Sequence, residues 1–170
     1  RDPLIINDKQ KFTVEEYLEL SRTSKIKYEY YRGEIFVMPD VGPQHNILFW
    51  NVYVGLVNGL QEKICQTYSC SLRINIPQNT LHTYPDILII CKNIREEVLN
   101  DDFVNEPTVL IEILSPSAKE FDKGQKFHLY KDIPTLKKYV RISSENIHIE
   151  ISRLAGEQQW ILQEYNQIDE

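Results

Sequence analysis

The chain has 170 residues, of which 42% are hydrophobic, 26% charged and 11% aromatic. Because this much apolar and aromatic mass can be buried, the composition excludes a wholly disordered chain and is typical of one globular domain. The longest apolar runs are far shorter than the roughly 20 residues of a transmembrane helix, and the first residues lack the apolar segment of a secretory signal. We therefore expect a cytoplasmic protein with no membrane partner, made of an N-terminal extension (1–11), one domain (12–166) and a C-terminal tail (167–170).

The formal net charge is −6, so the field of the whole molecule does not attract nucleic acid. The charge is unevenly distributed, because seven Lys or Arg residues stand against three acids between Lys119 and Arg141. A solvated helix face explains such a segment, and so does a surface that binds an anionic ligand. The three cysteines follow no zinc or redox spacing, and we expect them to be buried thiols.

Local signals predict the elements of the first third of the chain. Thr13 followed by Glu16 forms a capping box, which predicts a short helix over residues 14–21. Arg32-Gly33 is a tight-turn pair, and it predicts a hairpin between residues 27–31 and 34–38. Residues 43–63 carry apolar side chains at a spacing near 3.6, which predicts a long helix.

The remaining two thirds are dominated by predicted strands. Residues 66–76 alternate between polar and apolar side chains, as in a half-exposed strand. Residues 86–91 and 108–114 are almost continuously apolar, which is typical of strands covered on both faces in the middle of a sheet. The other predicted elements are a helix over 117–132 and strands over 138–142, 146–152 and 159–165. This order predicts an α/β (α+β) fold with a mixed central sheet flanked by helices.

Two carboxylates lie where burial would not place them. Asp86 opens one of the two apolar strands, and Glu112 lies inside the other. An ionised carboxylate in such a place costs several kcal/mol unless it is paired or binds a metal. Each acid alone is compatible with a buried salt bridge, or with a place at a sheet edge where the acid stays hydrated, but two acids on adjacent strands can converge on one point. Oxygen ligands of this kind suit Mg²⁺ or Mn²⁺.

Further polar residues are candidates for the same site. Asp122, Lys126 and Tyr130 recur at intervals of four and therefore share a helix face, where Lys126 could act on a phosphate or form an ordinary surface pair with Asp122. Glu34 begins a strand after the hairpin turn, and His45 lies near the start of the long helix. Glu34 is equally compatible with an exposed hairpin charge, and His45 with a polar residue of the first helical turn.

These residues stand in the order and spacing of a known family. The motifs are Tyr31-Arg-Gly-Glu, then His45, Tyr84-Pro-Asp, Ile111-Glu-Ile-Leu-Ser-Pro-Ser and Asp122-x-x-x-Lys-x-x-x-Tyr. From about residue 12 to 165, the chain resembles the large bacterial endonuclease family with the PD-(D/E)XK, restriction-endonuclease-like fold. The segment from Ile111 onwards, with the helix that follows it, is the most specific part of this resemblance.

The resemblance implies a set of roles for these residues. Asp86, Glu112 and the backbone carbonyl of Ile113 would bind Mg²⁺, which Mn²⁺ could replace. Leu114 occupies the place of the superfamily's usual lysine, and Lys126 would substitute for that lysine. Glu34 would be an additional acid near the metal and His45 would line the site, while Tyr130 and Asp122 would hold Lys126. The implied activity is Mg²⁺-dependent hydrolysis of phosphodiester bonds in nucleic acid, with DNA the expected substrate.

Two other classes of function remain open. One is a catalytically inactive nucleic-acid-binding or regulatory module that keeps the nuclease fold. The other is a dimerisation protein that uses the long helix or an edge strand, and a dimer is also the oligomer expected of an endonuclease that cuts both strands. The endonuclease interpretation requires Asp86 and Glu112 to lie close together, with the amine of Lys126 beside them and open to solvent.

Overall fold

The computed structural model describes residues 11–92, 103–115 and 122–169. In chain order, its elements are α1 (Val14–Thr23), β1 (Tyr28–Tyr31), β2 (Glu34–Val37), α2 (Pro43–Gly59), β3 (Gln66–Ser69), β4 (Arg73–Ile76), β5 (Leu81–Thr83), β6 (Ile87–Ile90), β7 (Phe103–Val104), β8 (Val109–Leu114), the π-helical turn η2 (Asp122–Lys126), α4 (Phe127–Tyr130), β9 (Lys138–Ser143), β10 (Ile149–Leu154) and β11 (Trp160–Tyr165). Within these ranges, no helix combines the length and apolar character needed to cross a membrane. The predicted mixed sheet with flanking helices is confirmed, and it is divided into two sheets.

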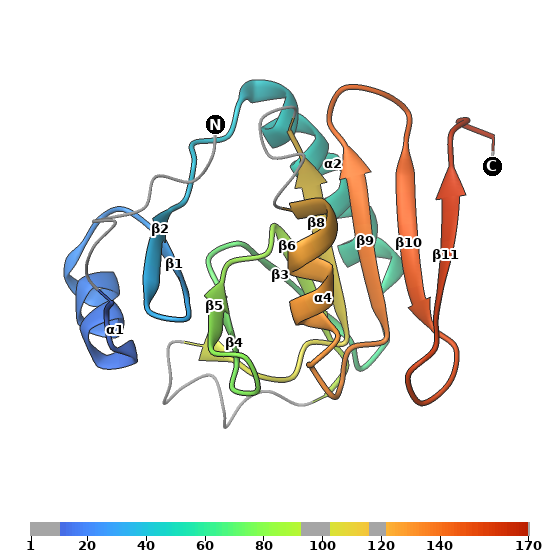
Figure 1. Ribbon diagram of the computed structural model, residues 1–170. Helices are drawn as coiled ribbons and strands as arrows, with labels where there is room; N and C mark the ends of the chain where they lie inside the picture. The colour runs from blue at the N-terminus through green and yellow to red at the C-terminus, as the bar shows by residue number, and fades with distance from the viewer. Residues whose placement is uncertain (1–10, 93–102, 116–121, 170) are drawn as a thin grey trace.

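The smaller sheet has the order β2-β1-β5-β4-β7 and carries α1 on its outer side (Figure 1). The predicted capping box is present, since the side chains of Thr13 and Glu16 each accept a hydrogen bond from the other residue's backbone N–H. Tyr17 of α1 is fully buried and donates its hydroxyl to the carbonyl of Tyr28, 2.8 Å away. The sheet and α1 therefore share a small core, made largely of tyrosines.

The hairpin of β1 and β2 turns at Arg32 and Gly33, as predicted. Both residues have positive φ, 48° and 85°, and a side chain at Gly33 would also approach Lys11 to 2.8 Å. At position 33, only glycine combines a positive φ with the lack of a Cβ atom next to Lys11. The turn fixes the hairpin register, in which Tyr31 pairs with Glu34 and Glu29 with Phe36.

The larger sheet has the order β11-β10-β9-β8-β6-β3. β6 and β8 pair antiparallel inside this sheet, between β9 and β3, and both are buried along their length apart from the first residue of β8, as their apolar sequences predict. The helices α2 and α4 lie on opposite faces of this sheet (Figure 1). α2 ends four residues earlier than predicted. Of the predicted helix over 117–132, the described part contains η2 and the single turn α4, and residues 116–121 lie outside the described residues.

The prediction of a single strand over residues 66–76 is wrong. The chain turns between Ser69 and Leu72, whose carbonyl and N–H form a hydrogen bond of 3.1 Å. β3 before this turn joins the larger sheet, whereas β4 after it joins the smaller sheet. The alternating pattern is compatible with one strand or two, because it does not specify which sheet each half joins. The short strands β5 and β7 were likewise not predicted.

The prediction of three buried thiols is also wrong, since Cys65 and Cys91 form a disulfide. Gln66 pairs with Ile90 at one end of the antiparallel ladder of β3 and β6, and this register places the two cysteines opposite each other. The cysteine spacing could not reveal this, because the pairing depends on strand register. Cys70 is a free, partly exposed thiol.

Candidate active site

The register of the central strands brings Asp86 and Glu112 together. Ile87 pairs with Ile111, so one step further along the ladder places Asp86 opposite Glu112 on the same face of the sheet. The backbone N–H of Ile113 donates to Oδ2 of Asp86 at 2.7 Å, which holds this carboxylate against β8. The side chains are largely buried, 17% exposed at Asp86 and 8% at Glu112. The two acids therefore occupy one site beneath α4.

Two side chains from η2 and α4 approach the same oxygen of Glu112. The fully buried hydroxyl of Tyr130 donates to Oε1 at 2.7 Å, and Nζ of Lys126 lies 3.7 Å from that atom. Burial, followed by the negative charge of Glu112, raises the pKa of Tyr130 well above its usual value. Tyr130 is therefore a neutral hydrogen-bond donor that supports the charged carboxylate.

Glu29 is a site residue that sequence reasoning missed. Its Oε1 lies 3.2 Å from Nζ of Lys126 and accepts a hydrogen bond from the hydroxyl of Thr83. Tyr30 pairs with His82 where β1 meets β5, so the next step of the antiparallel ladder brings Glu29 beside Thr83. The available signal was the alternation of side chains along a strand. Tyr28 and Tyr30 are buried on the α1 side, so Glu29 between them faces the opposite side.

Glu34, the acid expected near the metal, occupies a different environment. Its side chain is 44% exposed and forms an ion pair with Nζ of Lys11 at 3.2 Å. Glu34 lies at the turn of the hairpin, whereas Glu29 lies two residues before the end of β1. The structure therefore brings Glu29, rather than Glu34, into contact with Lys126.

His45 reaches the site from the first turn of α2. The helix begins after Gly42 with Pro43 in its first turn, which suits a residue with no backbone N–H to donate. Nε2 of His45 lies 3.2 Å from Oδ1 of Asp86, and the side chain is 9% exposed. Its other ring nitrogen, Nδ1, is buried without a hydrogen-bond partner among the described residues. His45 and Ile113 thus contact different oxygens of the Asp86 carboxylate.

Lys126 differs from expectation in its exposure, because its side chain is 8% exposed rather than open to solvent. It is the last residue of the π-helical turn η2, and such rare turns are frequent at functional sites. The two acidic partners, Glu29 and Glu112, draw the ammonium inward. The side chain of Asp122 lies outside the described residues. Ile113 contacts the site through its N–H, and its carbonyl remains a predicted ligand.

The donor set fits a divalent cation that prefers oxygen ligands. Among the described residues, three largely buried carboxylates lie in this site: Glu29 and Glu112 contact the ammonium group of Lys126, and Asp86 lies opposite Glu112 and contacts His45. A buried carboxylate is costly unless it is paired or binds a cation. Asp86 and Glu112 are the two whose positions on adjacent strands allow them to share an ion, as Mg²⁺ sites built from one or two carboxylates do.

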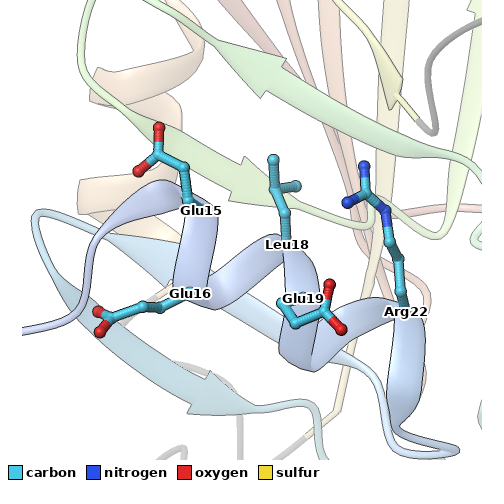
Figure 2. A pocket seen from close by; sticks show the side chains of 5 residues that line it. All are labelled: Glu15, Glu16, Leu18, Glu19 and Arg22. Carbon is cyan, nitrogen blue, oxygen red and sulfur yellow. The ribbon is translucent and has the colours of Figure 1, made fainter.

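Two other polar features lie elsewhere on the molecule. His148, Glu150 and Glu164 form an acidic cluster on β10, β11 and the turn before β10, with ligand atoms within 4.8 Å of one another. Glu150 is already ion-paired with Arg141. A surface pocket on α1 is lined by Glu15, Glu16, Leu18, Glu19 and Arg22 (Figure 2). Its three acids against one arginine would repel a phosphate backbone, so this pocket is unsuited to nucleic acid.

Comparisons with known proteins agree with this architecture. Two uncharacterized proteins of Synechocystis sp. (strain ATCC 27184 / PCC 6803 / Kazusa) are similar to the chain. The first, slr1290, is 28% identical over 94% of this chain and 83% of its own length. The second, sll1609, is 30% identical over 89% and 86%. The crystal structure of "a putative nuclease belonging to DUF820" from Anabaena variabilis ATCC 29413 shares the fold, with a TM-score of 0.76 and 21% identity over 94% of this chain and 87% of that chain.

The family model agrees with the resemblance drawn from the motifs. The model described as "Uma2: Putative restriction endonuclease" matches residues 14–170, which include Glu29, Asp86, Glu112 and Lys126. The chain therefore belongs to the Uma2 family.

Proposed function

We propose that this chain is a Mg²⁺-dependent endonuclease that hydrolyses phosphodiester bonds in DNA. Family membership supports the nuclease class. The observation that carries the proposal furthest is the pairing of Asp86 and Glu112 across β6 and β8, with Nζ of Lys126 3.7 Å from Glu112. Carboxylates and a lysine converging in one partly enclosed site are the groups that metal-assisted phosphodiester hydrolysis requires.

The carboxylates of Asp86 and Glu112, with the carbonyl of Ile113, would hold the Mg²⁺ ion. When bound, the ion supplies Lewis-acid stabilisation of a phosphate oxygen and lowers the pKa of a coordinated water. The N–H of Ile113 holds one oxygen of Asp86, and the ring of His45 holds the other. Tyr130 fixes Glu112 in the same way. These contacts place both carboxylates before metal or substrate arrives, which reduces the cost of ordering them.

Lys126 would donate hydrogen bonds to the oxygens of the scissile phosphate, where negative charge increases in the transition state. Without substrate, the carboxylates of Glu29 and Glu112 hold the ammonium group of Lys126 in place. Thr83 fixes Glu29 in turn through its hydroxyl. Glu29 is therefore a positioning residue, because it acts through Lys126. The basic segment between Lys119 and Arg141 would contact the phosphates that flank the cleaved bond.

One observation favours the alternative of an inactive nucleic-acid-binding module. Lys126 is 8% exposed and already ion-paired, and Leu114 occupies the position of the superfamily's usual lysine. A lysine that stayed in these ion pairs could not reach a phosphate. Such a protein would bind DNA without cleaving it, which separates the two functions experimentally.

Calorimetric titration with Mg²⁺, combined with cleavage of supercoiled plasmid DNA, tests the proposal. We expect the wild-type protein to bind the ion and to nick or linearise the plasmid. Glu112→Gln should lose both properties, because one ligand charge is removed. Lys126→Ala should still bind Mg²⁺ but cleave at least about 100-fold more slowly. Glu34→Gln is the matched control, since the same chemical change at an exposed acid outside the site should alter neither property.

The results distinguish the two functions and can reject both. DNA binding without cleavage by a protein that binds Mg²⁺ would overturn the endonuclease and favour the inactive module. Some sites take up metal only with DNA present. If the titration shows no binding, it would be repeated with Mn²⁺ and a DNA duplex, and electron paramagnetic resonance would measure the bound Mn²⁺. A folded wild-type protein that binds no ion under either condition would refute the metal site.

A further inference from the structure

The helix α2 (Pro43–Gly59) is apolar on both sides. It contains no Asp, Glu, Lys or Arg among its 17 residues. One side packs on the larger sheet through Leu48, Val52 and Leu56, in the cluster that includes Ile87 and Ile111. A helix with apolar side chains on two opposite sides is normally covered on both of them. The side of α2 that faces away from the sheet is nevertheless open to solvent.

Four side chains on this open side form one continuous row, which we name the α2 stripe. They are Ile47, Trp50, Val54 and Val57, with exposed fractions of 64%, 55%, 51% and 40%. Their spacing of three, four and three residues is the spacing of the contact seam between two packed helices. Single exposed apolar residues are common on protein surfaces, but a contiguous row of four marks an interaction site.

Trp50 is held in place although it is half exposed. Its ring contacts Phe49 edge-on, with centroids 5.2 Å apart, and Tyr53 at 5.9 Å. Phe49 and Tyr53 are partly buried against the sheet, and their rings stack on each other. A tryptophan that is already ordered loses little side-chain entropy on binding, and tryptophan is a frequent energetic centre of protein interfaces.

We propose that the α2 stripe binds the same stripe of a second copy of this chain, so that the protein is a homodimer about a two-fold axis beside α2. A charged partner would find no complementary charge on the helix, whereas two identical uncharged rows are self-complementary. Asn51 and Asn58 are exposed next to the stripe and supply polar groups that can hydrogen-bond across the axis and fix the register.

The area of the stripe matches a weak dimer. From their exposed fractions, the four side chains present on the order of 400 Å² of apolar surface. Two copies would cover about twice that area with the stripe alone, which lies below the roughly 1,200 Å² of stable interfaces and indicates a weak dimer. An interface of this size should dissociate on dilution, so the dimer should appear only at the higher protein concentrations.

Sedimentation velocity over protein concentrations from about 1 to 200 μM tests the dimer. We expect a concentration-dependent species of twice the 20.1 kDa chain mass. Val54→Glu places a charge in the middle of the stripe and should raise the dissociation constant more than about 10-fold. Ile26→Glu is the matched control, because Ile26 is 53% exposed just before β1, and it should leave the dimer intact.

The remaining outcomes are decisive. If Val54→Glu is not folded by circular dichroism, Val57→Glu makes the same test three residues further along the stripe. A wild-type chain that is monomeric at the highest concentration overturns the proposal. A dimer that tolerates both stripe variants, but dissociates with Leu162→Glu on the edge strand β11, also overturns it, since the interface would then lie at the sheet edge.

Discussion

Removing the hydroxyl of Tyr130 should destabilise the protein without disturbing its packing. This hydroxyl is buried and donates to Oε1 of Glu112 at 2.7 Å. The ring packs edge-on against Tyr139, with centroids 5.2 Å apart, and phenylalanine would keep that contact. A hydrogen bond to a charged group contributes about 1.5–3 kcal/mol, so we expect Tyr130→Phe to lower the free energy of unfolding by about 2 kcal/mol.

Urea denaturation at pH 7 measures this change, and a second background tests its cause. Glu112→Leu removes the charged acceptor and leaves the hydroxyl of Tyr130 as a buried donor without it. In this background, Tyr130→Phe should lower the free energy of unfolding by less than about 0.5 kcal/mol, or even raise it. Tyr30→Phe is the control, since its hydroxyl donates to the uncharged carbonyl of Phe12 at 3.1 Å. That variant should lose about 1 kcal/mol. A cost for Tyr130→Phe that is the same with and without Glu112 would refute the reasoning.

Two further predictions concern the smaller sheet. Glu29→Gln should lower DNA cleavage at least about 10-fold while Mg²⁺ binding persists, because Lys126 loses the charge of a partner 3.2 Å away. The same variant should destabilise the fold by about 1–3 kcal/mol, whereas Glu34→Gln should change stability by less than about 0.5 kcal/mol. Burial, followed by the charge of Arg73, lowers the pKa of His82 to about 4. The unfolded chain therefore takes up this proton below its usual pKa of about 6.5 while the folded chain does not, and stability falls by about 2 kcal/mol between pH 7 and pH 5. Urea denaturation at both pH values should show this loss, and His82→Phe should reduce it; an unchanged loss would exclude His82 as its source.

The sequence predicted those elements whose signals are local. The capping box of Thr13 and Glu16, the turn at Arg32 and Gly33, and the apolar strands that become β6 and β8 are each specified within a few residues. The division between β3 and β4 was missed because it depends on which sheet each strand joins. The disulfide was missed for a similar reason, since it follows from the pairing of strands that are about twenty residues apart.

The candidate site was predicted where burial made a polar residue conspicuous. Asp86 and Glu112 interrupt apolar strands, and the cost of burying a carboxylate makes such interruptions informative. Glu29 gives no comparable signal, because it lies in a short strand of mixed polarity. Its partner Lys126 is 97 residues away along the chain. The family motif Tyr31-Arg-Gly-Glu instead indicated Glu34, which directly follows the glycine turn.

The geometry of β1 explains why Glu29 occupies the site and Glu34 does not. Tyr28 and Tyr30 face α1, where Tyr17 closes their core, so alternation along the strand turns the residue between them towards the other face. Pairing with β5 then places that residue beside Thr83, three positions before Asp86. β5 leads directly into β6, so Thr83, which contacts Glu29, and Asp86 lie on one continuous segment that passes from the smaller sheet to the larger sheet. Glu34, at the hairpin turn, instead contacts Lys11, although it belongs to the more distinctive sequence motif.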